Sequence, residues 1–490
     1  MSKSTPKKNH FFQLIFTVAL KQELPLEWLK NRAPVLTLSA VESGQLQRTN
    51  SERGILFLVT GVGPEASKRA AGCILKHFSP LFVVNLGTAG AVNGEHSHTL
   101  GELVYPKYLS ISGKTVPINT YPLPFPNTLS SPKGRLASVP TDCIDYIDME
   151  SAIQAEAFKA EPFHFHILKV VSDFHNHQTA SSFQKALPLC RKTIRRLLQF
   201  LSISPPKIST IIPTFNRRHT LNRAIQSVLN QDYPCQELII IDDGSNDGTQ
   251  KLINALQKKA PQHTDIRFAR LKSNHGVSTA RNKGLSMAKN DWIAFLDSDD
   301  EWTSNKLKKQ IQFLNRYPFY RLLQSEETWI RNGKHFNKKE YHIKKGGWIF
   351  SSCLERCMIS MSSLLIHREL LSTRFDPSLP ACEDYDLFLT LSRHYPVGLE
   401  PSDALIKYGG HSDQLSTKYL VMDQFRVRAL SRLLQTENQD YFKEKILLVL
   451  EKKLTIILTG IRNRPTSILN DKQDTIYEQL FKVRKELGKT

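Results

Sequence analysis

The sequence predicts an α/β protein built from two α/β domains and followed by a helical C-terminal tail. Two long stretches alternate short β-branched runs with helical runs, and their predicted strands end in glycine-bearing or acidic turns. This alternation is typical of parallel sheets whose crossover connections are helices. The chain has 490 residues. Since domains average about 150 residues, it is long enough for more than one hydrophobic core.

The first domain is predicted to span residues 1–201. Its apolar stretch 11–20 follows several lysines and so mimics a secretory signal, but it contains Gln13 and lacks a small-residue cleavage site, which favours a buried strand. Residues 111–142, rich in Pro, Ser and Thr, are predicted to form loop or irregular strands. The other predicted elements are strand 55–59, helix 65–77, strand 81–85, helix 150–160, strand 166–171 and the basic amphipathic helix 181–201.

Residues 202–207 are predicted to be a linker, because their adjacent prolines favour extended chain. The second domain is predicted to span residues 208–420, and a helical extension residues 421–490. Its predicted elements are strand 208–212, helix 221–230, strand 237–241, helix 248–259, strand 265–271, helix 277–288 and strand 292–296. Sheets of this kind bind ligands at the carboxyl ends of their strands.

Composition narrows the function classes. Lys and Arg total 66 against 46 for Asp and Glu, which gives a net charge of +20 and predicts attraction to phosphorylated ligands or anionic membranes. Basic and aromatic residues are not interleaved along one stretch, which argues against nucleic acid as a partner. No apolar run reaches the ~18 residues of a membrane-spanning helix. The seven cysteines include no CxxC pair, which predicts a reducing, cytoplasmic location without structural zinc.

Polar or acidic residues follow three of the predicted strands in the second domain, at 213–217, 242–245 and 297–300. The last segment holds three carboxylates within four residues. Such groups repel one another unless a cation or solvent lies between them, and a divalent ion that bridges phosphates would satisfy them. For an isolated Asp-x-Asp sequence, a solvated acidic turn is the alternative.

The motif is not isolated. Five segments follow one another over residues 207–390, namely PTFNR, IIIDDGSNDGT, NHGVSTARNKGL, IAFLDSDD and ACEDYDLFL. In this order they resemble the family 2 glycosyltransferases of the GT-A fold. The resemblance implies an inverting transferase that uses Mg2+ or Mn2+. It also implies a nucleotide-sugar donor, preferably a UDP-sugar, and a glycan, lipid-linked or protein acceptor at the cell surface.

The resemblance also implies which residues bind the donor. Thr214, Phe215 and Asn216 match the segment that holds the base and ribose of the nucleotide. Asp243 matches the acid that bonds the base, and Arg281 matches a position that contacts the nucleotide or its phosphates.

The same resemblance implies the metal site and the catalytic base. Asp297 and Asp299 match the DxD pair, with Asp299 as the direct metal ligand. His411, in a glycine-bearing loop, is a candidate third ligand or phosphate contact. Glu383 and Asp384 match the family's acidic pair, and Asp384 is predicted to deprotonate the acceptor hydroxyl. An acidic pair favoured by the dipole of a helix N-terminus is the structural alternative.

A second signature lies in the first domain. Glycine turns follow two of its predicted strands and place backbone amides where an anion or ribose can approach. The segments concerned are 60–63 and 85–90, together with 19–23, 148–150 and 172–173. Over about residues 11–195 this set resembles the purine nucleoside phosphorylase and nucleosidase superfamily.

That resemblance implies a nucleoside site. Asp173 would protonate the purine leaving group and Glu23 would help to activate water. The implied nucleoside-binding residues are Thr88, Gly90, Met149 and Glu150. The stretch between residues 90 and 148 is short for the superfamily, so a degenerate binding or scaffold domain remains the alternative to an active one.

Two overall functions therefore compete. The main hypothesis is a glycosyltransferase that carries a nucleosidase-like domain. The rival makes purine nucleoside cleavage the main activity, with the transferase domain as a binding platform. A peripheral contact with the inner face of the membrane is also predicted, because the basic helices 191–201 and 425–434 would suit an anionic lipid surface.

Overall fold

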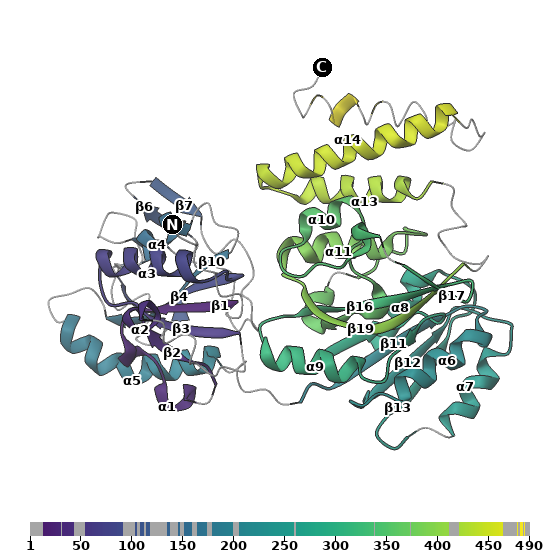
Figure 1. Ribbon diagram of the computed structural model, residues 1–490, viewed down its shortest axis with the longest axis horizontal. Coiled ribbons are helices and arrows are strands. Elements are labelled where there is room, and N and C mark those ends of the chain that lie inside the picture. The colour runs from purple at the N-terminus through teal and green to yellow at the C-terminus, as the bar shows by residue number, and fades with distance from the viewer. Residues whose placement is uncertain are drawn as a thin grey trace, which may run out of the picture. The chain divides into compact units, whose positions relative to one another are not determined.

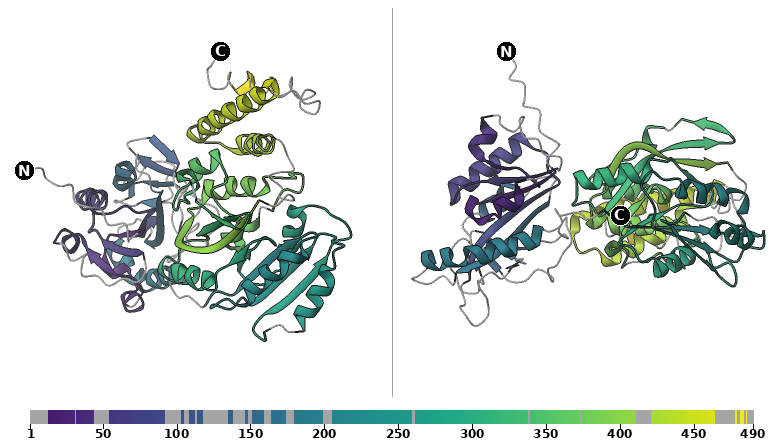
Figure 2. Two further views of the ribbon diagram at one scale, coloured as in Figure 1. Left: turned by 45° about the vertical axis from the view of Figure 1, so that its right-hand side comes forward. Right: turned by 90° about the horizontal axis from the view of Figure 1, so that it is seen from below.

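The chain divides into two compact units, shown in Figures 1 and 2. One comprises residues 1–204 with 313–320, and the other comprises residues 205–312 with 321–490. The computed structural model describes residues 13–30, 32–43, 54–91, 103–104, 108–111, 114–117, 135–137, 146–147, 151–158, 164–173, 179–198, 205–258, 261–337, 339–372, 374–410, 421–463, 478, 481–483 and 485.

A largely parallel sheet forms the first unit. Its strands are β1 Leu14–Val18, β2 Val35–Thr37, β3 Ile55–Val59, β4 Phe82–Ala91, β5 Leu103–Val104, β6 Tyr108–Ile111, β7 Lys114–Pro117, β8 Arg135–Ala137, β9 Tyr146–Ile147 and β10 His164–Asp173. The order is β2-β3-β1-β4-β9-β8-β6-β7, and β10 pairs with β4 and β5. All five residues of β1 are buried, and β3 and β4 flank it in parallel, which confirms the strand predicted within 11–20.

Helices cover this sheet. They are α1 Leu26–Leu29, α2 Leu38–Glu42, α3 Pro64–His77, α4 Ser151–Phe158 and α5 Thr179–Leu197. Figure 1 shows α3 and α5 on opposite faces of the sheet. The short elements α1, β2 and α2 were not predicted, because segments of three to five residues are too short to show a period.

The second unit has a mixed sheet. Its strands are β11 Ile208–Thr214, β12 Glu237–Asp242, β13 Asp265–Arg270, β14 Trp292–Phe295, β15 Glu301–Trp302, β16 Leu322–Arg331, β17 Lys334–Phe336, β18 Leu365–His367 and β19 Gly398–Gly409. The order is β13-β12-β11-β14-β18-β16-β19-β15, and β17 pairs with β16. Strands β11 to β14 are mutually parallel, as predicted, whereas β18 is antiparallel to β14. The α/β class is thus confirmed for both units.

The helices of this unit are α6 Arg218–Leu229, α7 Thr249–Gln257, α8 Val277–Met287, α9 Lys306–Arg316, α10 Phe350–Glu355, α11 Glu383–His394, α13 Asp423–Thr436 and α14 Asp440–Asn463. The last four residues of α9, 313–316, are grouped with the first unit. Helix α8 packs closely on β11, where a Cβ on Gly284 would lie 2.5 Å from Cγ2 of Ile211. The glycine therefore sets how near α8 comes to the sheet. Figures 1 and 2 show α13 and α14 layered on α10 and α11, and these helices share one apolar core.

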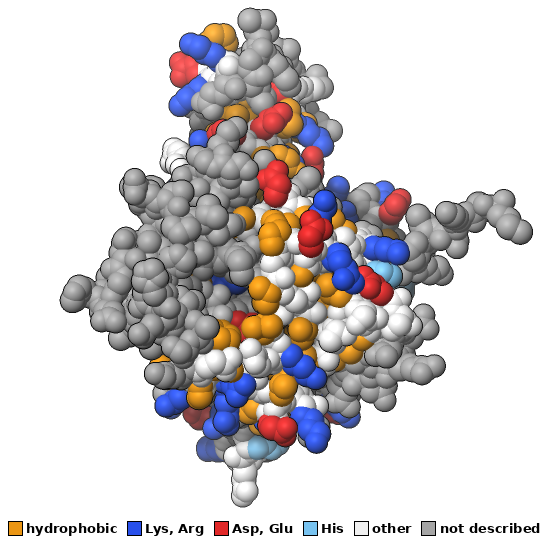
Figure 3. Space-filling model, turned by 90° about the vertical axis from the view of Figure 1, so that its left-hand side faces the viewer, with side chains coloured by type: hydrophobic (Ala, Val, Ile, Leu, Met, Phe, Trp, Pro, Cys, Tyr) orange, Lys and Arg blue, Asp and Glu red, His pale blue; other side chains and the backbone are white. Residues whose placement is uncertain are grey.

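Among the residues that the structure describes, no helix combines the length and apolar character needed to cross a bilayer. On the face in Figure 3, the described basic and acidic side chains are mixed, with hydrophobic ones between them. One cation on each of the helices predicted to face lipid contacts protein: Arg191 donates to the Gln22 carbonyl at 2.6 Å, and Arg432 pairs with Asp376 and Asp386. The lipid contact remains a prediction.

Candidate active site

The carboxyl ends of β11, β12 and β14 meet at one edge of the second sheet, because these parallel neighbours run in register. Thr214, at the end of β11, pairs with Asp242 at the end of β12. Ile211 pairs with Phe295, the last residue of β14, so the acidic turn that follows β14 lies at the same edge. This edge therefore collects the three segments predicted to form the site.

The third carboxylate of the acidic turn anchors it. Asp300 is buried, and its Oδ2 accepts a hydrogen bond from Ser362 Oγ at 2.6 Å. Its Oδ1 accepts one from the Tyr408 backbone N–H at 3.3 Å, which ties the turn to the end of β19. Burial raises the pKa of Asp300 well above its usual value. Both oxygens of Asp300 are thus used to hold the turn. Asp297 and Asp299 are the carboxylates of the turn that remain as candidates to bind a metal ion.

Arg281, on α8, joins the acidic turn to the start of α11. Its Nη2 donates to Asp297 Oδ1 at 2.8 Å, and its Nη1 donates to Glu383 Oε1 at 2.6 Å. The Arg281 side chain is only 4% exposed. The two predicted acidic motifs, which lie far apart in the sequence, are therefore parts of one site, bridged by a buried guanidinium.

This bridge sets opposite titration behaviour at its two ends. Burial acts to raise the pKa of Asp297, but the adjacent Arg281, together with Lys407 and Arg217, more than offsets it, so that pKa lies below its usual value. Glu383 is buried more deeply, and its pKa is raised because the guanidinium offsets only part of the cost of burial. The field of the same two carboxylates outweighs burial at Arg281 and raises its pKa. Arg281 therefore stays charged.

Asp299 has its own counter-ion, Arg217. The Nη1 of Arg217, which follows β11 in the PTFNR segment, is ion-paired with Asp299 Oδ2. The Asp299 backbone carbonyl accepts a separate hydrogen bond from Arg223 Nη2, on α6, at 2.7 Å. Arg217 belongs to the PTFNR motif but is not among the residues predicted from the sequence to bind the donor or the ion.

Asp384 lies in the first turn of α11, beside Glu383. The helix is preceded by Cys382, whose φ of 63° is left-handed and strained for a residue other than glycine. Cys357 Sγ lies 3.5 Å from Asp384 Oδ2. Burial raises the pKa of the Cys357 thiol well above its usual value, so the thiol stays protonated and donates to the carboxylate.

Lys407, on β19, is a cation of this site that the sequence analysis missed. Burial acts to lower its pKa, but the surrounding carboxylates raise it above the usual value. Those carboxylates are Glu327, Asp300, Asp297 and Asp384. The one sequence signal was a lysine between apolar residues of a strand, just before the Gly409–Gly410 pair.

Comparisons with known proteins identify the family of the second unit. Residues 209–359 match the family described as Glycosyl transferase family 2. The chain is 31% identical to the Escherichia coli UDP-Glc:alpha-D-GlcNAc-diphosphoundecaprenol beta-1,3-glucosyltransferase WfaP, over 38% of this chain and 69% of that protein. The chain belongs to glycosyl transferase family 2. The resemblance inferred from the five motifs is thereby confirmed.

Two further matches of this family 2 member are a curated relative and a solved structure. A second Escherichia coli enzyme of the same stated activity, WfgD, is 32% identical over 38% of this chain and 69% of its own length. A crystal structure of S. aureus TarS 1-349 with UDP-GlcNAc covers 56% of this chain and 81% of that chain, at 18% identity and a TM-score of 0.46. Coverage of other relatives varies: the chain spans 79% of the Bacillus subtilis putative teichuronic acid biosynthesis glycosyltransferase TuaG, at 29% identity, but 51% of an uncharacterized glycosyltransferase of Rickettsia felis.

The residues predicted to bind the nucleotide lie at the ends of β11 and β12. Thr214 is buried and, among the described residues, its hydroxyl has no hydrogen-bond partner. Phe215 is 41% exposed, and Asn216 adopts a φ of 51°. The two oxygens of Asp243 accept the backbone N–H groups of His275 and Gly276, at 2.8 Å each. Their roles toward a nucleotide remain predictions.

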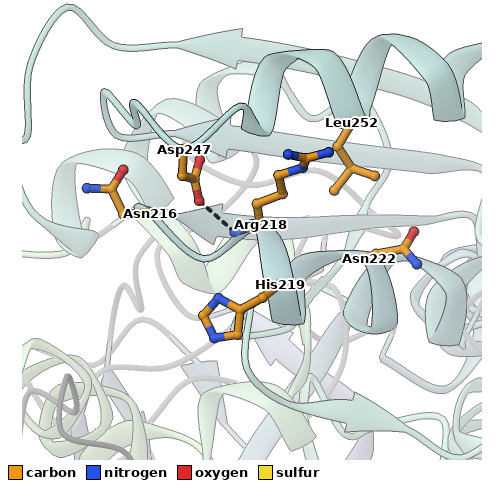
Figure 4. Close-up of a pocket in the computed structure, with 6 residues that line it drawn as sticks. All are labelled: Asn216, Arg218, His219, Asn222, Asp247 and Leu252. Atoms are coloured by element: carbon orange, nitrogen blue, oxygen red, sulfur yellow. Dashed lines mark hydrogen bonds between the residues drawn. The ribbon is translucent and has the colours of Figure 1, made fainter.

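An open hollow of about 540 Å³ lies beside Asn216. Figure 4 shows its lining, to which α6 contributes Arg218, His219 and Asn222. The remaining two lining residues are Asp247 and Leu252. Asp247 Oδ2 accepts the Arg218 backbone N–H at 2.8 Å and so satisfies one of the free donors at the start of α6. The hollow thus lies beside the first turn of α6.

The first unit brings together two of its predicted nucleoside residues. Glu23 is 2% exposed and accepts hydrogen bonds from the Thr88 hydroxyl at 2.7 Å and the Thr88 N–H at 3.1 Å. A third donor, the Leu20 N–H, lies 2.9 Å from its other oxygen. Strand register pairs Asp173 with Gly90, although the Asp173 side chain lies outside the described part of the chain. Met149, Glu150 and His411 also lie outside the described residues.

Proposed function

We propose that this protein transfers a sugar from a nucleotide-sugar donor to a lipid-linked or cell-surface glycan, with inversion at the anomeric carbon. One observation carries the proposal: Arg281 bridges Asp297 of the acidic turn and Glu383 of the acidic pair at the carboxyl edge of the sheet. Family membership supports it. The two relatives of which 69% is covered are named as UDP-Glc-dependent enzymes acting on a diphosphoundecaprenol-linked sugar, which favours a UDP donor and a polyprenol-linked acceptor.

The donor set suits a hard divalent ion such as Mg2+ or Mn2+. Asp297 and Asp299 supply carboxylate oxygens two residues apart, at the edge where a diphosphate would lie. The described residues contain no group of three or more His, Cys, Asp or Glu side chains arranged to hold an ion, so diphosphate oxygens would complete the coordination. When bound, the ion would neutralise charge on the departing nucleoside diphosphate.

In the proposed reaction Asp384 accepts the proton of the acceptor hydroxyl. The hydroxyl oxygen attacks the anomeric carbon as the bond from that carbon to the diphosphate breaks, and the nucleoside diphosphate leaves. Glu383 is unsuited to the same task because Arg281 holds its carboxylate. Arg281 thus gives the two neighbouring acids different roles: Glu383 is the positioning residue and Asp384 is the base.

Replacing Asp299 with Ala is expected to weaken metal-dependent binding of UDP by about 100-fold or more, because one of two protein carboxylates for the ion is lost. Calorimetric titration of the full-length chain with UDP, GDP, CDP and dTDP, each with and without Mn2+, checks this prediction and identifies the nucleobase of the donor. Asp291→Ala is the matched control, since this exposed acid lies at the opposite end of β14. Equal Mn2+-dependent affinity in wild type and Asp299→Ala would contradict the assignment.

Nucleoside cleavage by the first unit is the second candidate. The contact between Glu23 and Thr88 favours it, since both residues were implied by the same resemblance. Purified full-length protein is then expected to release purine base from nucleosides without metal, and Glu23→Gln to lower that rate by about 100-fold. The exposed Glu27→Gln is the control. If Glu23→Gln releases base as fast as wild type, or wild type releases none, this candidate fails.

A further inference from the structure

The ion pair between Arg217 and Asp299 occupies a carboxylate that the proposed reaction needs for another purpose. Both side chains are 17% exposed, so the pair is only partly buried and solvent reaches it. Among the described residues, Arg217 is the side chain that pairs with this carboxylate. Any cation that binds Asp299 must therefore displace, or share the carboxylate with, a guanidinium.

The acidic turn does not need this pair to keep its shape. Arg223 holds the Asp299 backbone carbonyl at 2.7 Å, from a different element than Arg217. Ser362 and the Tyr408 N–H hold the next residue, Asp300, on both of its oxygens. Loss of the Arg217 contact would leave the turn anchored on either side of the Asp299 carboxylate.

Arg217 can leave its carboxylate partner more easily than Arg281 can. Arg281 is buried between two carboxylates and cannot leave either without stranding a charge. Arg217 projects from the turn after β11, where Asn216 has a left-handed φ of 51°. That turn belongs to the segment predicted to hold the nucleotide, so a diphosphate bound there would bring negative charge to the guanidinium.

We propose that Arg217 makes metal loading depend on the donor. In the free protein it competes with the divalent ion for Asp299, and when the nucleotide binds it turns to the diphosphate and releases the carboxylate. This inference rests on the proposed function. Since coupling between two ligands is reciprocal, the ion and the nucleotide should each raise the affinity for the other by the same factor.

Arg217→Gln separates the two roles. Without the competing charge, the free protein is expected to bind Mn2+ about five- to tenfold more tightly than wild type. At saturating Mn2+ it is expected to bind UDP about tenfold more weakly, because a charged contact to phosphate is lost. The factor by which Mn2+ raises UDP affinity should therefore shrink in the variant. Loss of a merely structural residue would weaken both ligands together.

The experiment measures Mn2+ binding to full-length protein by electron paramagnetic resonance, without nucleotide, and then UDP binding by calorimetry at several Mn2+ concentrations. Arg218→Gln is the matched control, because it removes the same charge from the next residue. The backbone N–H of Arg218 donates to Asp247 and not to Asp299. Arg217→Lys keeps the charge and should bind Mn2+ nearly as wild type does. It provides the comparison if Arg217→Gln does not fold.

The outcomes are distinct. Tighter Mn2+ binding by Arg217→Gln alone, with weaker UDP binding, supports the inference. Unchanged or weaker Mn2+ binding overturns it, as does an equal effect in Arg218→Gln. If Arg217→Gln is unfolded, weaker Mn2+ binding by Arg217→Lys than by wild type overturns it. If wild type binds Mn2+ but no nucleotide under any condition, the proposed function fails instead, and the Mn2+ titration still reports the competition at Asp299.

Discussion

Asp384→Asn is expected to lower the rate of sugar transfer by about 10²- to 10⁴-fold, the range that a positioned general base contributes. The amide keeps the shape of the side chain and the hydrogen bond to the Tyr385 N–H at 2.7 Å. It cannot accept the acceptor proton. UDP binding should stay within about twofold of wild type, because the substitution leaves Asp297, Asp299 and Arg281 in place.

The measurement is the initial rate of transfer from the donor that calorimetry identifies to a polyprenol-diphosphate-linked sugar. Asp440→Asn is the control, since Asp440 is also an acid in the first turn of a helix but is fully exposed. Wild-type turnover in Asp384→Asn would remove Asp384 from the role of base. A parallel loss in Glu383→Gln would not, because that change also frees Arg281.

Arg281→Gln is expected to cost about 3–5 kcal/mol of unfolding free energy and to abolish transfer. The substitution removes the cation that lies between two acids. Removing one partner of a buried ion pair is strongly destabilising, because the carboxylates left behind stay partly or wholly buried without a counter-ion. Most of that cost falls on Glu383, whose side chain is 7% exposed, because solvent still reaches Asp297. Protonation of Glu383, whose pKa already lies above its usual value, would relieve part of the loss at acidic pH.

Urea denaturation followed by tryptophan fluorescence measures this effect. Four of the five tryptophans, at 292, 302, 329 and 348, lie in the second unit, so the signal reports mainly on that unit. Arg331→Gln, an exposed arginine at the end of β16, should change stability by less than ~0.5 kcal/mol. Arg281→Lys should fall between the two, because it keeps the charge but loses the two-pronged geometry. Equal stability of Arg281→Gln and wild type would contradict the assigned bridge.

Much of the second unit follows from the sequence. The strands 208–212, 237–241, 265–271 and 292–296 were predicted close to the observed β11, β12, β13 and β14. Buried parallel strands are continuous apolar runs, so they are visible without knowledge of their neighbours. The acidic turn was placed correctly after β14 for the same reason, since its position depends only on where one strand ends.

The division of labour inside the site was not predictable from sequence. Glu383 and Asp384 are neighbours in a single motif, and only the fold decides that Arg281, 102 residues away, binds the first. Likewise, Arg217 and Asp299 are 82 residues apart and meet because β11 and β14 are adjacent strands.

The sequence by itself therefore determined the α/β class, the family 2 motifs and the strand ends that carry the acids. The tertiary structure alone decided which charges pair, and so which carboxylates are held and which face the site. The physical reason is the separation along the sequence of the residues involved. The hydrophobic pattern of a strand and the turn that ends it depend on residues that are close together in the chain. An ion pair depends on how packing brings distant elements together, and no local pattern records it.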